Sequence, residues 1–164
     1  MIKNLTDFFK CLDKELKEFD ITLKEEWFID HICYRTSSLD NYKDICDDYL
    51  RRNTLLVEGN VGGRLISTFK LKEPIKYQDR LIPLVEVPQP KRDSTPEGYE
   101  HIEVVVSESF EQIKSLFPQG NFKSHALKKD INPELVLKLD KCVIKFHHQS
   151  LEDVIKYEKK MGLV

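Results

Sequence analysis

Apolar residues near the start of the chain recur every three or four positions, at Leu5, Phe8, Phe9, Leu12, Leu16 and Phe19. This spacing places them on one face of a helix over residues 2–19. A second, short helix is expected over residues 23–27. Further helices are predicted from Ser38 through residue 52, over residues 109–117, and from Ser150, where Asp153 three residues on resembles a capping box.

Between these helices the pattern changes to the β-rich runs typical of strands. The predicted strands cover residues 29–35, 55–60, 64–72, 81–87, 99–106, 135–139 and 143–147. Gly62 and Gly63 predict a turn. Pro83 cannot donate a hydrogen bond to a neighbouring strand, so we expect it on an edge strand or at a bulge. The polar stretch 89–98 is expected to be a linker, and a loop is expected to run through about residue 130.

The same order of elements occurs twice along the chain. DHICYRTSSLDNYKDI parallels EHIEVVVSESFEQIKSL, and FKLKEPI parallels LKLDKCV. In the first pair, each copy opens with an acidic residue and His-Ile, continues as a strand, and has serines where a helix begins. We therefore predict an α+β fold in which two pseudo-symmetric βαβββ modules, residues 29–88 and 99–148, form curved mixed sheets around a cleft. The flanking helical segments are residues 1–28 and 149–164, and the whole is a single domain of residues 1–164.

This duplication brings two histidines, His31 and His101, into equivalent positions. Packing about a pseudo-twofold axis would make both face one shared cleft. Alternation along the strands places Cys33 and Arg35 on the side of His31, and Glu103 on the side of His101. Polar side chains on a face that is otherwise a candidate for the core need a partner or a ligand. This face is therefore the candidate functional site.

Composition and charge exclude several classes of protein. The 164 residues include 26 Lys and Arg against 28 Asp and Glu, for a net charge of −2, which provides no basic surface for nucleic acid or an anionic membrane. No apolar run approaches the ~20 residues of a membrane span, and charges run through the N-terminus, unlike a signal peptide. The cysteines form no C-x-x-C pair, so we expect reduced thiols in a cytoplasmic protein, at Cys11, Cys33, Cys46 and Cys142.

Five segments taken in order, DHICYRT, GRLISTFKLKEPI, LVEVPQP, GYEHIEV and IKFHHQSLEDVIKYE, resemble the YecM-like family of the vicinal oxygen chelate superfamily, which has the glyoxalase/dioxygenase fold. In that superfamily the first and last strands of each module supply the ligands of one metal. The resemblance implies that His31 and Glu86 of the first module, and His101 and His147 of the second, bind a divalent ion. The last strand departs from many members, which have a carboxylate there, and alternation turns only one of His147 and His148 inward.

Histidines with a carboxylate suit a divalent metal such as Zn, Ni, Fe, Mn or Co, which is the expected cofactor. The alternative is that these histidines are satisfied polar residues lining a small-ligand cleft. Glu103 could bind the metal, orient a histidine or act as a general base. Arg35 is a candidate for binding a carboxylate or phosphate of the substrate. The competing interpretation is that Arg35 and Glu103 form an ion pair. We expect His125 and His148 in loops or at the surface. Other strand-borne cations are expected on a solvated face, namely Arg64, Lys70 and Lys145.

Three functions are compatible with these observations. The first is a metal-dependent isomerase, lyase or dioxygenase acting on a small oxygen-bearing substrate, with Glu103 and Arg35 as catalytic residues and Glu103 or Glu86 moving a proton. The second is a non-catalytic small-ligand or metal-binding module, and the third an interaction protein whose duplication is only structural. The expected partner is a small-molecule ligand rather than nucleic acid or membrane, and a homodimer is one option for the assembly. The sequence contains no nucleophile elbow, phosphate-binding glycine loop or dinucleotide fingerprint.

Overall fold

The computed structural model describes residues 1–91, 96–128 and 131–164. Helix α1 spans Leu5–Glu18 and precedes the first module. The elements of the first module are β1 (Phe28–Arg35), α2 (Leu39–Leu50), β2 (Thr54–Val61), β3 (Arg64–Tyr77) and β4 (Arg80–Pro88). Those of the second are β5 (Gly98–Val105), α3 (Phe110–Leu116), β6 (Asn121–Lys123), the short 3-10 helix η1 (His125–Lys128), β7 (Leu135–Lys138) and β8 (Val143–His147). Helix α4 (Leu151–Met161) follows.

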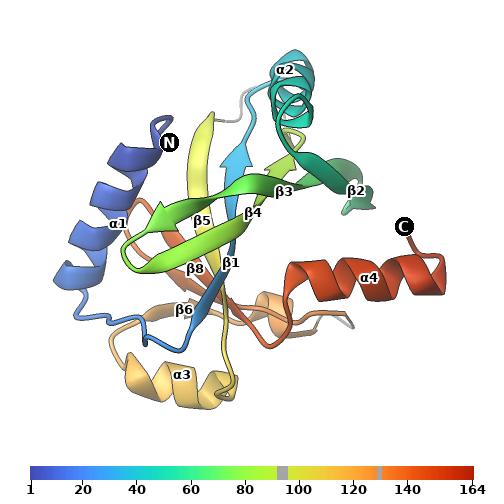
Figure 1. Ribbon diagram of the computed structural model, residues 1–164. Helices are drawn as coiled ribbons and strands as arrows, with labels where there is room; N and C mark the ends of the chain where they lie inside the picture. The colour runs from blue at the N-terminus through green and yellow to red at the C-terminus, as the bar shows by residue number, and fades with distance from the viewer. Residues whose placement is uncertain (92–95, 129–130) are drawn as a thin grey trace.

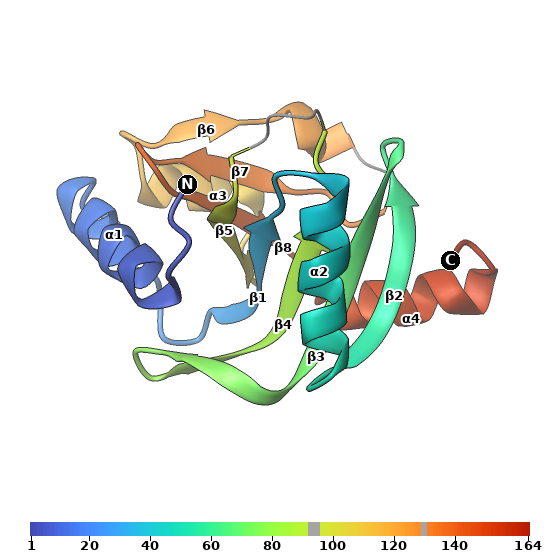
Figure 2. The ribbon, with the colours of Figure 1, turned by 90° about the horizontal axis from the view of Figure 1, so that it is seen from above.

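The βαβββ order therefore occurs twice, as the sequence predicts. Within the described residues the strands form an eight-stranded sheet in the order β2-β3-β4-β1-β5-β8-β7-β6. The first strands of the two modules, β1 and β5, pair antiparallel at its centre, and each pairs in parallel with the last strand of its own module, β4 or β8. Figures 1 and 2 show the resulting curved sheet. The predicted α+β fold with two pseudo-symmetric modules is confirmed.

The two faces of this sheet differ in polarity because side chains alternate along each strand. One face packs into a continuous apolar core with residues of α1, α2 and α3; the core includes Leu12, Ile32, Tyr42, Ile102, Val104, Ile113 and Phe146. The opposite face carries the predicted polar residues. Helix α4 lies on that side, where the backbone N–H of Leu151 donates to Asp30 and Lys70 pairs with Glu152. The fold thus places the predicted polar residues of the central strands opposite the apolar core.

Serine side chains cap three of the helices, as expected from the sequence. Ser38, Ser109 and Ser150 each accept a hydrogen bond from the backbone N–H three residues later. These caps satisfy donors that a helix leaves unpaired in its first turn. They explain why each of these helices begins within one residue of its predicted start.

Two irregular segments differ from the prediction. Residues 23–27 form no helix. A helix this short forms too few hydrogen bonds to offset the entropy cost of its nucleation. The side chain of Trp27 packs against Phe117 and Phe146. Arg80 binds the carbonyl oxygens that such a helix would use. The predicted loop before residue 130 contains β6, which pairs with β7, and η1.

The strands also show two features that periodicity alone does not specify. β3 continues to Tyr77, past the predicted end at residue 72, because it pairs with β4 on both sides of a register shift. Pro83 lies at that shift, in a strand with neighbours on both sides. Of the two expectations for Pro83, the bulge is correct and the edge strand is not.

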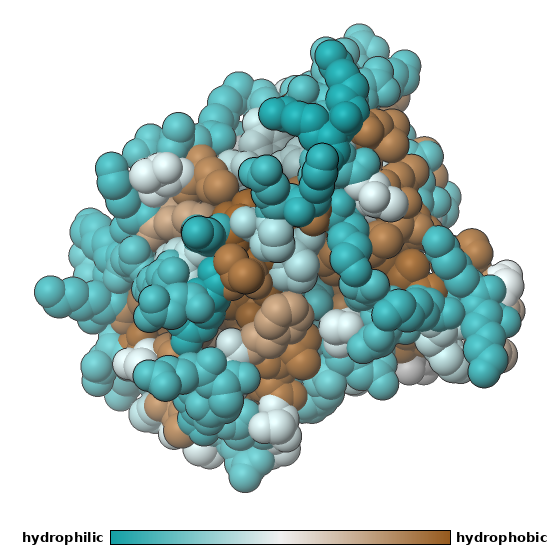
Figure 3. All heavy atoms as spheres, viewed as in Figure 1, coloured by the Kyte–Doolittle hydropathy of each residue, from teal (hydrophilic) through white to brown (hydrophobic). Residues whose placement is uncertain are grey.

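The middle of the predicted linker, residues 92–95, and the end of the predicted loop, residues 129–130, lie outside the described residues. In the described parts of the chain, none of the helices has the length and apolar character needed to cross a membrane. Figure 3 shows hydrophilic side chains over much of the face seen in Figure 1, with hydrophobic ones gathered toward the middle and right of the view.

Candidate metal centre

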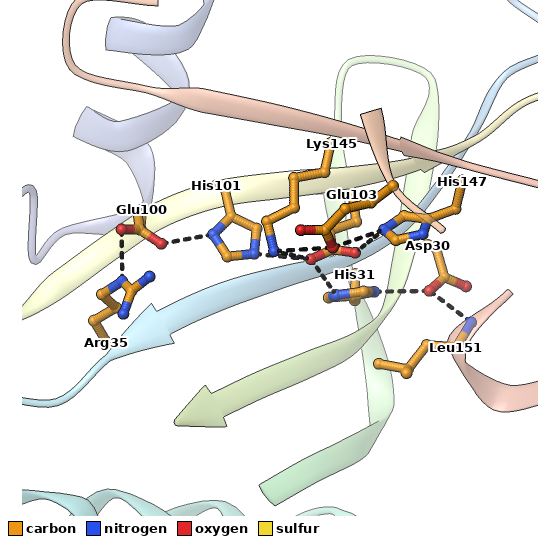
Figure 4. Close-up of polar contacts among 10 residues, drawn as sticks. Asp30, His31, Arg35, Glu100, His101, Glu103, Lys145, His147 and Leu151 are labelled. Atoms are coloured by element: carbon orange, nitrogen blue, oxygen red, sulfur yellow. Dashed lines mark hydrogen bonds and ion pairs between the residues drawn. The ribbon is translucent and has the colours of Figure 1, made fainter. Parts of the chain in front are cut away.

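Two buried histidines lie on the adjacent central strands, His31 on β1 and His101 on β5. They are 3% and 2% exposed. The acidic residue that precedes each histidine holds its ring: Asp30 Oδ2 lies 2.7 Å from His31 Nδ1, and Glu100 Oε2 lies 2.8 Å from His101 Nδ1 (Figure 4). Because Nδ1 of each ring is occupied, Nε2 is the nitrogen left to bind a ligand. In both rings Nε2 points toward Glu103.

Glu103 is the centre of this polar cluster. Its Oε1 lies 3.0 Å from His101 Nε2, 3.3 Å from His31 Nε2 and 2.7 Å from Lys145 Nζ, while its Oε2 contacts His147 Nε2. Glu103 is 5% exposed. A buried carboxylate is destabilising unless it is paired, so these contacts are what allow it to remain charged. Its position on the face of His101 follows from strand alternation.

The side chains form two sets that share Glu103. In the first set, His31, Glu86, His101 and Glu103 each bring one ligand atom to within 4.8 Å of the others; in the second, Glu103, Glu134 and His147 do the same. Three of the four ligands that the resemblance implied, His31, Glu86 and His101, thus converge, and Glu103 lies with them. His147 contacts the other oxygen of Glu103 and belongs to the neighbouring set.

The register of the parallel strands identifies which positions of the two modules are equivalent. In β4, Glu86 pairs with the residue two positions after His31, and in β8, Lys145 pairs with the residue two positions after His101. Lys145 is therefore the counterpart of Glu86, and His147 lies two residues farther along. The sequence could not distinguish the two because alternation puts both on the same face, and only strand pairing sets the register.

Burial and charge act in opposite directions on the residues of the cluster. Burial disfavours the charged ring of His31, but the negative charge of Glu103 and the hydrogen bond with Asp30 outweigh it and raise the pKa of His31 to about 10. Burial alone would raise the pKa of Glu103, yet the positive charges of Lys145 and His31 hold it well below its usual range. Negative and positive groups therefore stabilise one another here.

Arg35 acts on this cluster indirectly. Its Nε lies 2.6 Å from Glu100 Oε1 (Figure 4). Burial acts against the charged form of Glu100, but the contact with His101 and the charge of Arg35 keep the pKa of Glu100 at about 2. Arg35 therefore pairs with the carboxylate that holds His101. The competing interpretation, an ion pair between Arg35 and Glu103, is not what the structure shows, because Glu103 pairs with Lys145.

The remaining predictions for polar residues had mixed outcomes. Lys145 was expected on a solvated face, which is wrong: its side chain is 20% exposed and contacts Glu103. Lys70 agrees better with that expectation, at 48% exposure. His148 is exposed and stacks on Phe110, and His125 is exposed in η1, as predicted. All four cysteines have free thiols.

Sequence reasoning missed four residues of the cluster, Asp30, Glu100, Glu134 and Lys145. A signal for the first two was present, because each duplicated segment has an acidic residue directly before its histidine. The structure shows that this residue holds the ring, and that Asp30 also accepts from the backbone N–H of Leu151 at 3.0 Å. No comparable signal pointed to Glu134, which lies 3.7 Å from Lys145 Nζ.

The residues present fit a divalent metal. His31 Nε2 and both ring nitrogens of His147 are buried and, among the described residues, have no well-aligned hydrogen-bond partner. A buried polar atom without a partner is destabilising. Imidazole nitrogen is also a ligand that first-row divalent metals bind readily, together with carboxylate oxygen.

Residues 1–158 match the family described as YecM protein. The chain is 28% identical over 149 residues to Protein YecM of Escherichia coli (strain K12), covering 79% of this chain and 78% of that protein. It is 32% identical over 104 residues to an uncharacterised protein of Haemophilus influenzae, covering 63% of this chain and 54% of that protein. This second alignment spans only about half the length of the Haemophilus relative.

Solved structures share the fold. The structural-genomics target Protein EC4020 superposes with a TM-score of 0.79 at 28% identity, covering 94% of this chain and 88% of that chain. A methylmalonyl-CoA epimerase superposes with a TM-score of 0.50 at 13% identity, covering 76% of this chain and 97% of that chain, a likeness that concerns the fold alone. The chain therefore belongs to the YecM family, and it shares the fold of a methylmalonyl-CoA epimerase.

Proposed function

We propose that this protein binds one divalent transition metal through His31, Glu86, His101 and Glu103. The observation that carries the proposal is His31 Nε2, which is buried, 3.3 Å from Glu103 Oε1, and without a well-aligned hydrogen bond among the described residues. Asp30 holds the opposite nitrogen of the same ring. A ring fixed in this way has one unused nitrogen aimed at a set of ligand atoms, which is the arrangement of histidine ligands in metal sites.

The set of ligand atoms restricts the metal. Two imidazole nitrogens and two carboxylate oxygens suit Zn, Ni, Fe, Mn or Co, whereas Mg and Ca prefer oxygen alone. The fold shared with the vicinal oxygen chelate superfamily supports the proposal, since the site lies on the first strands of both modules and on β4. We therefore propose a divalent metal of this group as the cofactor.

The activity we propose is that of a metal-dependent isomerase, lyase or dioxygenase acting on a small oxygen-bearing substrate. The metal would supply Lewis-acid stabilisation of negative charge that develops on the substrate oxygen. Glu86 is half-buried, unlike the buried Glu103, so Glu86 is the carboxylate that a substrate can approach and that can hold a proton. Arg35 is a positioning residue, because it acts through Glu100.

One observation favours a second candidate, a non-catalytic binding module. His31, His101 and Glu103 are at most 5% exposed, and the ammonium of Lys145 lies against Glu103. A catalytic metal needs an open position for substrate, and burial of this kind leaves little room for one.

The test of the proposed site is the His101→Ala variant, studied by thermal melting with EDTA and with added Zn, Ni, Mn, Co or Fe(II). Wild type should melt at a higher temperature when its metal is present, because a ligand that binds only the folded state stabilises it. His101→Ala should lose this shift and remain folded, since Ile102 and Val104 pack on the other face of β5.

His148→Ala is the matched control, because His148 is exposed and outside both sets of ligand atoms. It should keep the wild-type response to metal. Elemental analysis of protein purified without chelator then identifies the metal. Identical melting of the wild type with EDTA and with every metal would overturn the proposal.

A further inference from the structure

Lys145 holds the position in the second module that Glu86 holds in the first. In the first module this position supplies a carboxylate to the set of ligand atoms, and in the second it supplies an ammonium. The second carboxylate comes instead from Glu103 on the neighbouring strand. The second module thus contributes both a ligand and a cation that binds that ligand.

The geometry makes the two uses of Glu103 compete. Lys145 Nζ lies 2.7 Å from Glu103 Oε1, the same oxygen that lies 3.0 Å from His101 Nε2 and 3.3 Å from His31 Nε2. The side chains of Lys145 and Glu103 are only 20% and 6% exposed. In such a poorly solvated place an ammonium attracts the carboxylate strongly and repels a divalent cation bound to the same group.

We propose that the ammonium of Lys145 is a built-in competitor of the metal for Glu103. In the metal-free protein, Lys145 neutralises Glu103 and so preserves the fold. A metal at the set of His31, Glu86, His101 and Glu103 shares Glu103 with Lys145 or takes it from Lys145. Lys145 therefore lowers the affinity for metal and keeps the ion exchangeable. This inference rests on the metal site proposed above.

The variants Lys145→Met and Lys145→Gln test it. Methionine keeps most of the length of the side chain and removes the charge. Glutamine also removes the charge but keeps a hydrogen-bond donor for Glu103, so it provides a second test if Lys145→Met does not fold. Lys70→Met is the matched control: Lys70 is another lysine on a strand of the sheet and pairs with Glu152, at 2.9 Å. Each full-length protein is stripped with EDTA and titrated with Zn²⁺ and Mn²⁺ against a competing fluorescent chelator.

Both Lys145 variants should bind metal at least about tenfold more tightly than wild type, because removing one nearby positive charge at low solvent exposure is worth that much or more. Their melting temperature in EDTA should fall, since Glu103 loses the ammonium among its four partners. The rise in melting temperature on adding metal should exceed that of wild type. Lys70→Met should keep wild-type affinity.

Wild-type binding combined with equal or weaker binding by both Lys145 variants would overturn the inference and leave the metal site standing. That result would mean that Lys145 holds Glu103 in place for the metal. Absence of binding in wild type and in both variants would overturn the metal site and this inference together. Binding by the variants alone would overturn the proposed metal site of the wild type and support the competition by Lys145 for Glu103.

Discussion

Asp30 connects the candidate site to helix α4, and replacing it with asparagine tests this connection. Asp30 is 3% exposed, and its Oδ2 accepts from Leu151 N–H at 3.0 Å and lies 2.7 Å from His31 Nδ1. The Asp30→Asn variant has nearly the same shape and retains one oxygen that can take the place of Oδ2. It loses the negative charge, so both contacts become hydrogen bonds to a neutral acceptor.

The magnitude follows from these two contacts. A hydrogen bond to a charged group contributes about 1.5–3 kcal/mol and one to a neutral group about 0.5–1.5 kcal/mol, so two weakened contacts cost about 2 kcal/mol. The lost charge at the N-terminus of α4 adds about 0.3–1 kcal/mol. We expect a free energy of unfolding lower by about 2–3 kcal/mol, and a melting temperature lower by roughly 4–12 °C for a chain of this size.

Urea unfolding followed by circular dichroism in the presence of EDTA measures this change. Asp44→Asn, at an exposed position of α2, is the control and should change the free energy of unfolding by less than about 0.5 kcal/mol. Titration of the same proteins with metal should show an affinity about 10–100-fold lower in Asp30→Asn, because a neutral amide oxygen holds the His31 ring less firmly than the carboxylate does. If Asp30→Asn unfolds like Asp44→Asn, the two contacts do not stabilise the protein and the reasoning is wrong.

Two further predictions concern buried or partly buried carboxylates. Glu15 of α1 is 3% exposed and accepts hydrogen bonds from the backbone N–H groups of Lys141 and Cys142 at 2.8 and 3.0 Å. Glu15→Ala should lower the free energy of unfolding, measured in urea, by about 3 kcal/mol, because two buried donors lose their acceptor. Glu18→Ala, on the exposed side of the helix, should have little effect. Glu100 has a pKa of about 2 in the folded protein against 4.5 ordinarily, so its contribution is present above pH 4.5 and is lost as the pH falls toward 2. Melting curves between pH 7 and 3 should therefore show a steeper acid loss in wild type than in Glu100→Gln, and parallel curves would contradict this assignment.

The duplication includes the acidic residue before each histidine as well as the histidine itself. Asp30 and Glu100 hold equivalent nitrogens of equivalent rings, so the two modules present their histidines in the same orientation. The modules then diverge, because the position that carries Glu86 in one carries Lys145 in the other. The site is thus symmetric in its histidines and asymmetric in its charges.

The sequence by itself determined the duplicated order of elements, the faces of the central strands and the caps of three helices. It also indicated His31, His101 and Glu103 as residues of one face. These features depend on short-range regularities, namely period-2 alternation, helical spacing and a serine at the start of a helix, which neighbouring residues specify without distant partners.

Tertiary structure alone decided which residues meet at the site. Alternation assigns a side chain to a face but leaves the register free, so only the pairing of β5 with β8 could make Lys145, and not His147, the counterpart of Glu86. Arg35 has its partner on the neighbouring strand, in Glu100. Asp30 bonds to a backbone group at the start of α4, far along the chain. Contacts of this kind depend on how whole elements pack, and several pairings are equally compatible with the local sequence.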